Sequence, residues 1–286
     1  MLGKSTAFSV NQVFNCRGKR LDINSPKIMG ILNLTDDSFF DGGINLKDDY
    51  FLIKAEELVK GGAVILDIGA VSTKPESKLI SHKEEWDILK RPLKMLKKQY
   101  PEIIFSVDTY NSSTAQKAAD VGVEMINDIS GGTIDNKMFE VVGENKLAYV
   151  LMHINGIPEN MQQNPVQGNL SDTLLAFFDK QLKLLKDNNV ENILLDPGFG
   201  FGKTLDQNYQ LLKGLEKFKC FNLPLLVGIS RKSMIFKQLN ISPQEALNGT
   251  SVLNTVALLN GASILRVHDS KEANETIKLF LKYKQF

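Results

Sequence analysis

Short apolar runs alternate with longer amphipathic stretches along nearly the whole chain. Eight runs rich in Ile, Val and Leu cover residues 28–32, 64–68, 103–107, 124–127, 147–152, 193–195, 225–228 and 264–267. Unbroken apolar runs are typical of parallel strands covered on both faces, whereas half-exposed strands alternate between apolar and polar positions. The stretches between the runs have the punctuation of helices. This alternation predicts an α/β fold, a (β/α)8 TIM barrel rather than an open, doubly wound sheet.

Several of the amphipathic stretches show where helices begin or end. Residues 81–98 open with Ser-His-Lys-Glu, a capping box, although Pro92 should kink or split that helix. Residues 48–60 are followed by two glycines, which predict a left-handed stop. Residues 170–186 place leucines and phenylalanine at helical spacing, as in a helix packed on a core.

The segment ahead of the first predicted strand has a different pattern. Residues 9–16 and 19–23 flank Arg17-Gly18, which predicts an N-terminal β-hairpin over residues 9–23. We expect this hairpin to plug the amino-terminal end of the barrel. The length of 286 residues suits one barrel, so a single domain is expected over residues 1–286.

Composition and charge are those of an ordinary globular protein. Of the residues, 43% are hydrophobic and 23% are charged, and the formal net charge is +1, which indicates no nucleic-acid or membrane partner. No apolar run approaches the roughly 18 residues that a membrane span needs, and residues 1–10 lack the apolar core of a secretion signal. Cys16 and Cys220 have no metal-type spacing and are expected to be reduced. A cytoplasmic location is therefore expected.

The most informative segment is 191–204, where an apolar run ends on a carboxylate and three glycines then alternate with two phenylalanines. Such glycines let the backbone approach a ligand closely, so Gly200 and Phe201 are candidate ligand contacts. The segment is not a phosphate-binding P-loop, which needs glycine where Pro197 stands. Nor is it the dinucleotide motif, which needs glycine where Lys203 stands.

Polar side chains lie at or just after the carboxyl end of every predicted strand. In chain order they are Asn33, Asp67, Asp108, Asn127-Asp128, His153, Asp196, Ser230-Arg231-Lys232 and Arg266-Val267-His268-Asp269. In a TIM barrel these positions share one face. A helix cap or a satisfied buried pair explains any single one, but the whole set favours one convergent polar site.

The residue types in this set suit two kinds of ligand. Asp108, Asn127 and Asp196 can accept and donate hydrogen bonds along the edge of a flat, nitrogen-rich ring. The side chains suited to an anion or its metal are Asn33, Arg266 and His268. A ring compound with a phosphate-bearing leaving group would engage both sets.

Eight segments together resemble the signatures of the dihydropteroate synthase family, in the family's order. They are residues 29–43 (MGILNLTDDSFFDGG), 68–75 (IGAVSTKP), 106–109 (SVDT), 126–131 (INDISG), 151–153 (LMH), 195–203 (LDPGFGFGK), 230–234 (SRKSM) and 266–268 (RVH). The resemblance implies a pterin-binding TIM barrel that acts as a transferase in folate biosynthesis. Such enzymes join 4-aminobenzoate to (7,8-dihydropterin-6-yl)methyl diphosphate and release diphosphate. The resemblance further implies a homodimer, Mg²⁺ as an aid to diphosphate departure, and sulfonamides as candidate inhibitors.

By motif position, the resemblance also assigns residues to each part of the reaction. The pterin pocket would consist of Asp108, Asn127, Asp196 and Lys232, with Ile129, Met152 and Gly228 as its apolar walls. Asn33 would help to hold Mg²⁺ and diphosphate, with Arg266 and His268 on the diphosphate. The aminobenzoate site would be bordered by Thr73, Lys74, Phe201 and Ser233. The expected catalytic residues are Asp108, Lys232, Asn33 and Arg266, and Asp108 would stabilise positive charge on the methylene group.

Two loops, residues 35–43 and 71–77, are expected to close over the site and to order only with diphosphate and Mg²⁺ bound. The first loop has Asp36 where the family commonly has proline. The second has Lys74 followed by Pro-Glu where the family commonly has Arg-Pro-Gly. Lysine keeps the charge of arginine but not its bidentate geometry, so these departures bear on aminobenzoate contacts and sulfonamide response.

Two other interpretations stay open. A methyltetrahydrofolate-binding barrel that passes a methyl group to a corrinoid protein shares the pterin pocket, but it lacks the diphosphate-type first loop and the Ser-Arg-Lys and Arg-Val-His segments. A non-catalytic barrel that only binds pterin or scaffolds an oligomer is supported by the loop substitutions alone.

Overall fold

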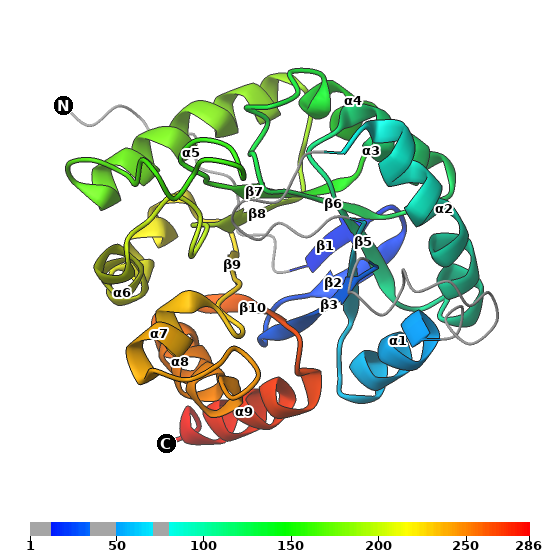
Figure 1. The fold of residues 1–286 in the computed structure, drawn as a ribbon. Coiled ribbons are helices and arrows are strands. Elements are labelled where there is room, and N and C mark those ends of the chain that lie inside the picture. The colour runs from blue at the N-terminus through cyan, green and yellow to red at the C-terminus, as the bar shows by residue number, and fades with distance from the viewer. Residues whose placement is uncertain (1–12, 35–49, 71–79) are drawn as a thin grey trace.

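The barrel predicted from the sequence is present and closed. The structure is a computed structural model and describes residues 13–34, 50–70 and 80–286 (Figure 1). Its eight parallel barrel strands are β3 (Lys27–Asn33), β4 (Ile65–Gly69), β5 (Ile104–Asp108), β6 (Met125–Asp128), β7 (Ala148–Met152), β8 (Ile193–Asp196), β9 (Leu225–Val227) and β10 (Ala262–Val267). Each strand pairs with the next along the chain, and β10 pairs with β3 to close the ring. Every predicted run coincides with one of these strands to within two residues at either end.

Helices follow the strands and cover the outside of the barrel (Figure 1). They are α1 (Tyr50–Lys60), α2 (His82–Gln99), α3 (Ser112–Asp120), α4 (Met138–Glu144), α5 (Leu170–Asp187), α6 (Leu205–Lys213), the 3₁₀ helix η2 (Leu215–Phe221), α7 (Ser233–Leu239), α8 (Leu247–Leu259) and α9 (Ser270–Tyr283). As predicted, α1 stops before Gly62, which has φ +104°. The predicted stripe of α5 is buried through Leu174, Phe178, Leu182 and Leu185. In the part of the chain that the structure describes, no helix is long and apolar enough to cross a membrane.

In helix α2, the local sequence determines where the helix begins, and core packing determines that it continues past its proline. The predicted capping box is present: Ser81 Oγ accepts the Glu84 N–H at 3.3 Å, and the Glu84 carboxylate accepts the Ser81 N–H at 3.0 Å. The prediction of a split at Pro92 is wrong, because the helix runs through it. Proline removes one backbone hydrogen bond, whereas Leu89 and Leu93 on either side are fully buried and hold both halves on the core.

The predicted hairpin closes the amino-terminal end of the barrel. Its strands are β1 (Val13–Cys16) and β2 (Lys19–Asp22), paired antiparallel. Residues 9–12 of the prediction lie outside the described residues. Phe14 and Leu21 pack on the apolar side chains that fill this end of the barrel. Arg17 donates to the carbonyl oxygens of Ala119 in α3 and Val123 ahead of β6, at 2.7 and 3.0 Å, so both packing and hydrogen bonds fix the plug.

The alternation of side chains along each strand also determines which residues face the interior at the carboxyl-terminal end of the barrel. The apolar layer next to the plug includes Ile65, Met125, Leu194 and Ile264. Two residues further along a strand, the side chain points to the same side. In these four strands that position is held by Asp67, Asn127, Asp196 and Arg266. The barrel interior therefore changes from apolar to polar toward its carboxyl-terminal face.

Candidate active site

Arg266 of β10 joins the polar layer into one network. Its Nε donates to Asp67 Oδ2 and its Nη2 to Asp108 Oδ2, both at 2.7 Å. Asn127 Nδ2 donates to the same Asp67 oxygen at 2.8 Å. Burial opposes the charge of Arg266, yet the two carboxylates outweigh it and hold the pKa of Arg266 above its ordinary value. Side chains from four strands thus meet around one fixed cation.

Two buried oxygens of this network are open acceptors. Asp67 Oδ1 and Asn127 Oδ1 have no hydrogen-bond partner among the described residues. An unpaired buried acceptor costs about 1–3 kcal/mol, so a ligand that donates N–H groups would be stabilised here. Beside them, burial raises the pKa of Asp108 to about 7, against the opposing effect of Arg266. The network is therefore suited to a flat ring with several donors.

Asp196 ends β8 and is held by the loop that follows it. Its Oδ1 accepts the Gly198 N–H at 2.8 Å, and burial raises its pKa. Gly198 has φ +72°, and a side chain there would collide with the backbone oxygen of His153. Gly200 has φ +84° in the same loop. Glycine is thus required where the loop folds back over Asp196.

Lys203 is buried beneath this loop and only 3% exposed. Its Nζ donates to the carbonyl oxygens of Gly198 and Phe201 at 2.8 and 3.0 Å, and lies 3.1 Å from His153 Nδ1. Burial lowers the pKa of Lys203 to about 7 and that of His153 to about 3. A neutral imidazole can accept from the lysine, so His153 belongs to the support of the loop.

Lys232, between β9 and α7, lies against the same loop from the other side. Its Nζ donates to the Phe199 carbonyl oxygen at 2.6 Å and lies 4.6 Å from the centre of the Phe201 ring. Burial lowers the pKa of Lys232 to about 8.

A separate apolar cluster consists of Tyr110, Ile129, Met152, Ile154, Met161 and Phe201. The predicted apolar contacts Ile129, Met152 and Phe201 therefore lie together.

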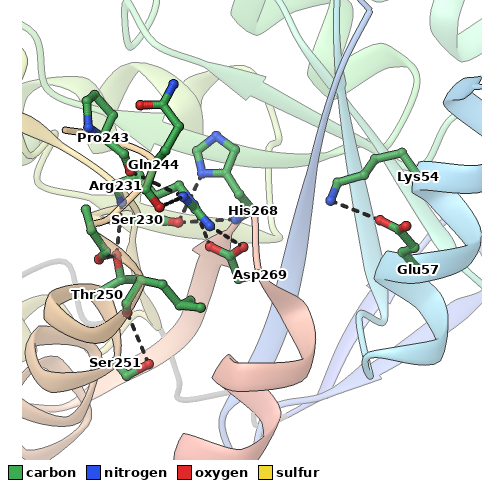
Figure 2. Close-up of polar contacts among 12 residues, drawn as sticks. Lys54, Glu57, Ser230, Arg231, Pro243, Gln244, Thr250, Ser251, His268 and Asp269 are labelled. Atoms are coloured by element: carbon green, nitrogen blue, oxygen red, sulfur yellow. Dashed lines mark hydrogen bonds and ion pairs between the residues drawn. The ribbon is translucent and has the colours of Figure 1, made fainter.

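The loops after β9 and β10 are locked to each other (Figure 2). Arg231 Nε and Nη2 donate to the two carboxylate oxygens of Asp269 at 2.8 and 2.9 Å. Ser230 Oγ accepts the backbone N–H of His268 at 3.2 Å and lies 3.0 Å from its Nδ1. In the tautomer that carries its proton on Nε2, Ser230 Oγ donates to Nδ1 and the Nε2–H of His268 remains a donor. Burial lowers the pKa of His268 to about 4, so the imidazole is neutral near pH 7.

A cavity of about 50 Å³ lies beside His268, with Asn33 and Lys54 also on its wall. Among residues 13–34, 50–70 and 80–286, no group of three or more His, Cys, Asp or Glu side chains is placed to hold a metal. Mg²⁺, however, is commonly bound by one or two protein oxygens together with substrate phosphates. The amide oxygen of Asn33 fits that second mode.

Most predicted site residues lie at the strand ends and following loops of the carboxyl-terminal face. These are Asn33, Asp108, Asn127, Ile129, Met152, Asp196, Gly200, Phe201, Gly228, Lys232, Ser233, Arg266 and His268. Gly228 faces the Arg266 side chain, and Ser233 is the first residue of α7. Thr73 and Lys74, and the predicted closing loops 35–43 and 71–77, lie outside the described residues.

Two strand-end residues do not join the convergent set, so that expectation is wrong for them. Asp128 accepts from the Tyr149 hydroxyl at 2.7 Å and from Ser130 at 2.7 and 2.8 Å. Since its neighbour Asn127 faces inward, alternation along β6 sends Asp128 to the helix side. His153 turns to Lys203, as described above.

Three residues at the site were assigned no specific role in the sequence analysis: Asp67 and Ser230, which appear there only among the strand-end residues, and Lys203. Asp67 could have been found from strand alternation, because it stands two residues after an inward apolar position of β4. A single lysine within a glycine-rich loop signals Lys203 only weakly. Nothing in the sequence pairs Ser230 with His268, which is 38 residues away.

Comparisons with known proteins agree with this geometry. The chain matches the family of pterin binding enzymes over residues 29–268. It is 38% identical to dihydropteroate synthase of Escherichia coli (strain K12) over 265 residues, 92% of this chain and 93% of that protein. It is 40% identical to dihydropteroate synthase of Synechocystis sp. over 257 residues, 88% of each. A crystal structure of Yersinia pestis dihydropteroate synthase in complex with a sulfonamide drug matches with a TM-score of 0.89 at 37% identity, over 96% of this chain and 100% of that one. The chain therefore belongs to the dihydropteroate synthase family of pterin-binding transferases.

Proposed function

We propose that this chain joins 4-aminobenzoate to the methylene carbon of (7,8-dihydropterin-6-yl)methyl diphosphate and yields 7,8-dihydropteroate and diphosphate. The observation that carries the proposal is the pair of open acceptors, Asp67 Oδ1 and Asn127 Oδ1, beside the Asp196 carboxylate at the same barrel end. A pterin ring presents several N–H donors along one edge, which these oxygens would accept. Ile129 and Met152 would pack on the faces of the ring.

The reaction requires positive charge to be tolerated at the methylene carbon, because an aromatic amine is a weak nucleophile. The bond from this carbon to the diphosphate oxygen breaks as the bond to nitrogen forms, and the amine nitrogen loses a proton. In its ionised form Asp108 would stabilise the developing charge. The hydrogen bond from Arg266 at 2.7 Å orients Asp108 and favours that form.

The leaving diphosphate would lie beside Asn33 and His268. The Nε2–H of His268 would donate to a phosphate oxygen, and the fixed Nδ1 contact to Ser230 orients the ring for it. The side-chain oxygen of Asn33 would hold Mg²⁺. When bound, Mg²⁺ supplies charge neutralisation of the diphosphate, which makes it a better leaving group.

The aminobenzoate site would lie next to Lys232 and Phe201, bordered by Ser233 and by Thr73 and Lys74 of the loop after β4. The Phe201 ring would offer a flat face to aminobenzoate, and the Lys232 ammonium, 4.6 Å from that ring, would donate to the pterin ring next to it. Sulfonamides share that shape and are proposed inhibitors. The sulfonamide complex of the related Yersinia pestis enzyme supports this proposal.

We also propose that the chain is a single pterin-binding domain that forms a homodimer in the cytoplasm. The support for a dimer is an apolar groove of about 480 Å³ between α8 and α9. Its rim includes the exposed side chains Val252, Leu259, Leu279 and Tyr283. A contiguous apolar surface of this kind marks interaction sites.

The proposed reaction is tested by supplying the purified chain with dihydropterin diphosphate, 4-aminobenzoate and Mg²⁺. Dihydropteroate and diphosphate are expected in equal amounts. Pterin binding without turnover would favour a non-catalytic barrel. Methyl transfer from methyltetrahydrofolate to a corrinoid protein, without diphosphate release, would favour the methyltransferase interpretation.

A further inference from the structure

Both arginines that the structure describes at the carboxyl-terminal face are already paired with carboxylates. Arg266 donates to the carboxylates of Asp67 and Asp108, and Arg231 donates to Asp269. His268, with its lowered pKa, offers a neutral donor. A diphosphate carries several negative charges, and these contacts leave little free positive charge for it in this part of the described structure.

Lys54 of α1 stands at the right place to supply that charge. It lines the same cavity of about 50 Å³ as Asn33 and His268. Figure 2 shows its side chain reaching from α1 toward the side on which His268 lies. The ammonium of Lys54 also contributes to the lowered pKa of His268, after the larger effects of burial, Arg266 and Arg231, so its charge acts on the imidazole.

The contact that Lys54 makes in this structure is easily exchanged. Its Nζ lies 3.2 Å from Glu57 Oε2, one turn along the same helix. The Lys54 side chain is 34% exposed and that of Glu57 is 62% exposed. Exposed ion pairs within a helix are weak, and a diphosphate oxygen would compete well with the Glu57 carboxylate.

We propose that Lys54 is a specificity-determining residue that binds the diphosphate group of the pterin substrate and the free diphosphate released from it. Its role rests on the proposed function, because it deepens the leaving-group site of that reaction. Lys54 exchanges Glu57 for a phosphate oxygen when diphosphate enters beside Asn33 and His268. Substrates without phosphates gain nothing from Lys54, so it selects the activated pterin over the free pterin.

Isothermal titration of the whole chain with inorganic diphosphate plus Mg²⁺, and separately with 7,8-dihydropterin, tests this role. In Lys54→Met, diphosphate affinity is expected to fall about tenfold, while dihydropterin affinity stays unchanged. Glu57→Gln frees Lys54 and is expected to tighten diphosphate binding two- to threefold. Lys60→Met is the matched control, because Lys60 lies on the same helix but pairs with Glu56 and its side chain is 74% exposed.

Equal diphosphate affinity of wild type and Lys54→Met would overturn the role of Lys54, as would an equal loss in Lys60→Met. If wild type binds dihydropterin but not diphosphate, the proposed role of Lys54 is contradicted, whereas the proposed pterin pocket is supported. If wild type binds neither, the proposed function fails as well.

Discussion

Asp108 and Lys232 are oppositely charged side chains that burial pushes toward their neutral forms. Burial raises the pKa of Asp108 to about 7 and lowers that of Lys232 to about 8. Asp108 must be ionised to stabilise positive charge on the pterin methylene. In the proposed pterin pocket, Lys232 must be protonated to donate a charge-assisted hydrogen bond to the ring. Both requirements are met together only in a narrow range near neutral pH.

The pH dependence of kcat/KM follows from these two groups. Activity is expected to rise as the pH passes about 7, where Asp108 loses its proton, and to fall as the pH passes about 8, where Lys232 loses its own. The measurement is kcat/KM for the pterin diphosphate across this range. In Lys232→Arg the guanidinium stays charged, so the alkaline decline should disappear. A flat profile in the wild type would contradict the assigned roles.

At the scale of elements, the conformation of the loop between β8 and α6 depends on Lys203, which lies outside the proposed ligand contacts. Lys203 supplies hydrogen bonds to carbonyl oxygens on the inner side of the loop, and the positive φ values of Gly198 and Gly200 bring those oxygens together. The same loop donates a backbone N–H to Asp196. Lys203 and the loop therefore help to fix the geometry of Asp196, the carboxylate proposed to bind the pterin.

Lys203→Met is expected to weaken both the fold and the site. Removing Nζ takes the donor from the Phe201 carbonyl oxygen and leaves the Gly198 carbonyl oxygen with the Phe201 N–H alone, at about 1–3 kcal/mol of unfolding free energy. A lower melting temperature and weaker pterin binding should appear together. Lys213→Met, at an exposed position of α6, is the control and should change neither. Unchanged pterin affinity in a destabilised Lys203→Met would show that the loop does not position Asp196.

The strands and most of the site could be predicted because each depends on local pattern. The ends of the apolar runs placed Asn127 and Asp196 at the carboxyl-terminal face, and glycine spacing marked the loop after β8. The features that were not predicted depend on tertiary contacts. Core packing of Leu89 and Leu93 carries α2 through Pro92, and a single step of alternation turns Asp128 away from the site. No local pattern reports that Arg266 meets Asp67, 199 residues away.

At the scale of the whole molecule, the two ends of the barrel differ: one end is packed with apolar side chains and the other carries the candidate active site. The hairpin and the apolar layer close the amino-terminal end, and polar side chains occupy the other. The α8–α9 face lies on the outside of the barrel (Figure 1). A homodimer through this face would leave the carboxyl-terminal opening accessible to substrates.

Leu279→Asp is expected to convert the proposed homodimer into a monomer. Leu279 is 74% exposed on α9, so a carboxylate costs the monomer little but would be buried at the interface. Light scattering after size-exclusion chromatography measures the mass. Leu184→Asp on α5, at a leucine that is 42% exposed and away from the groove, should remain a dimer. A dimer in both variants would place the interface elsewhere.

The central claim is that one polar layer at the carboxyl ends of the strands binds a pterin ring. Titration calorimetry with 7,8-dihydropterin tests it most directly, with wild type, Asp196→Ala and the exposed control Asp206→Ala compared. Asp196→Ala should lose about 1–3 kcal/mol of binding free energy, roughly five- to 150-fold in affinity, because ring donors are left unpaired. Asp206→Ala should bind like wild type. Wild-type affinity in Asp196→Ala would contradict the account.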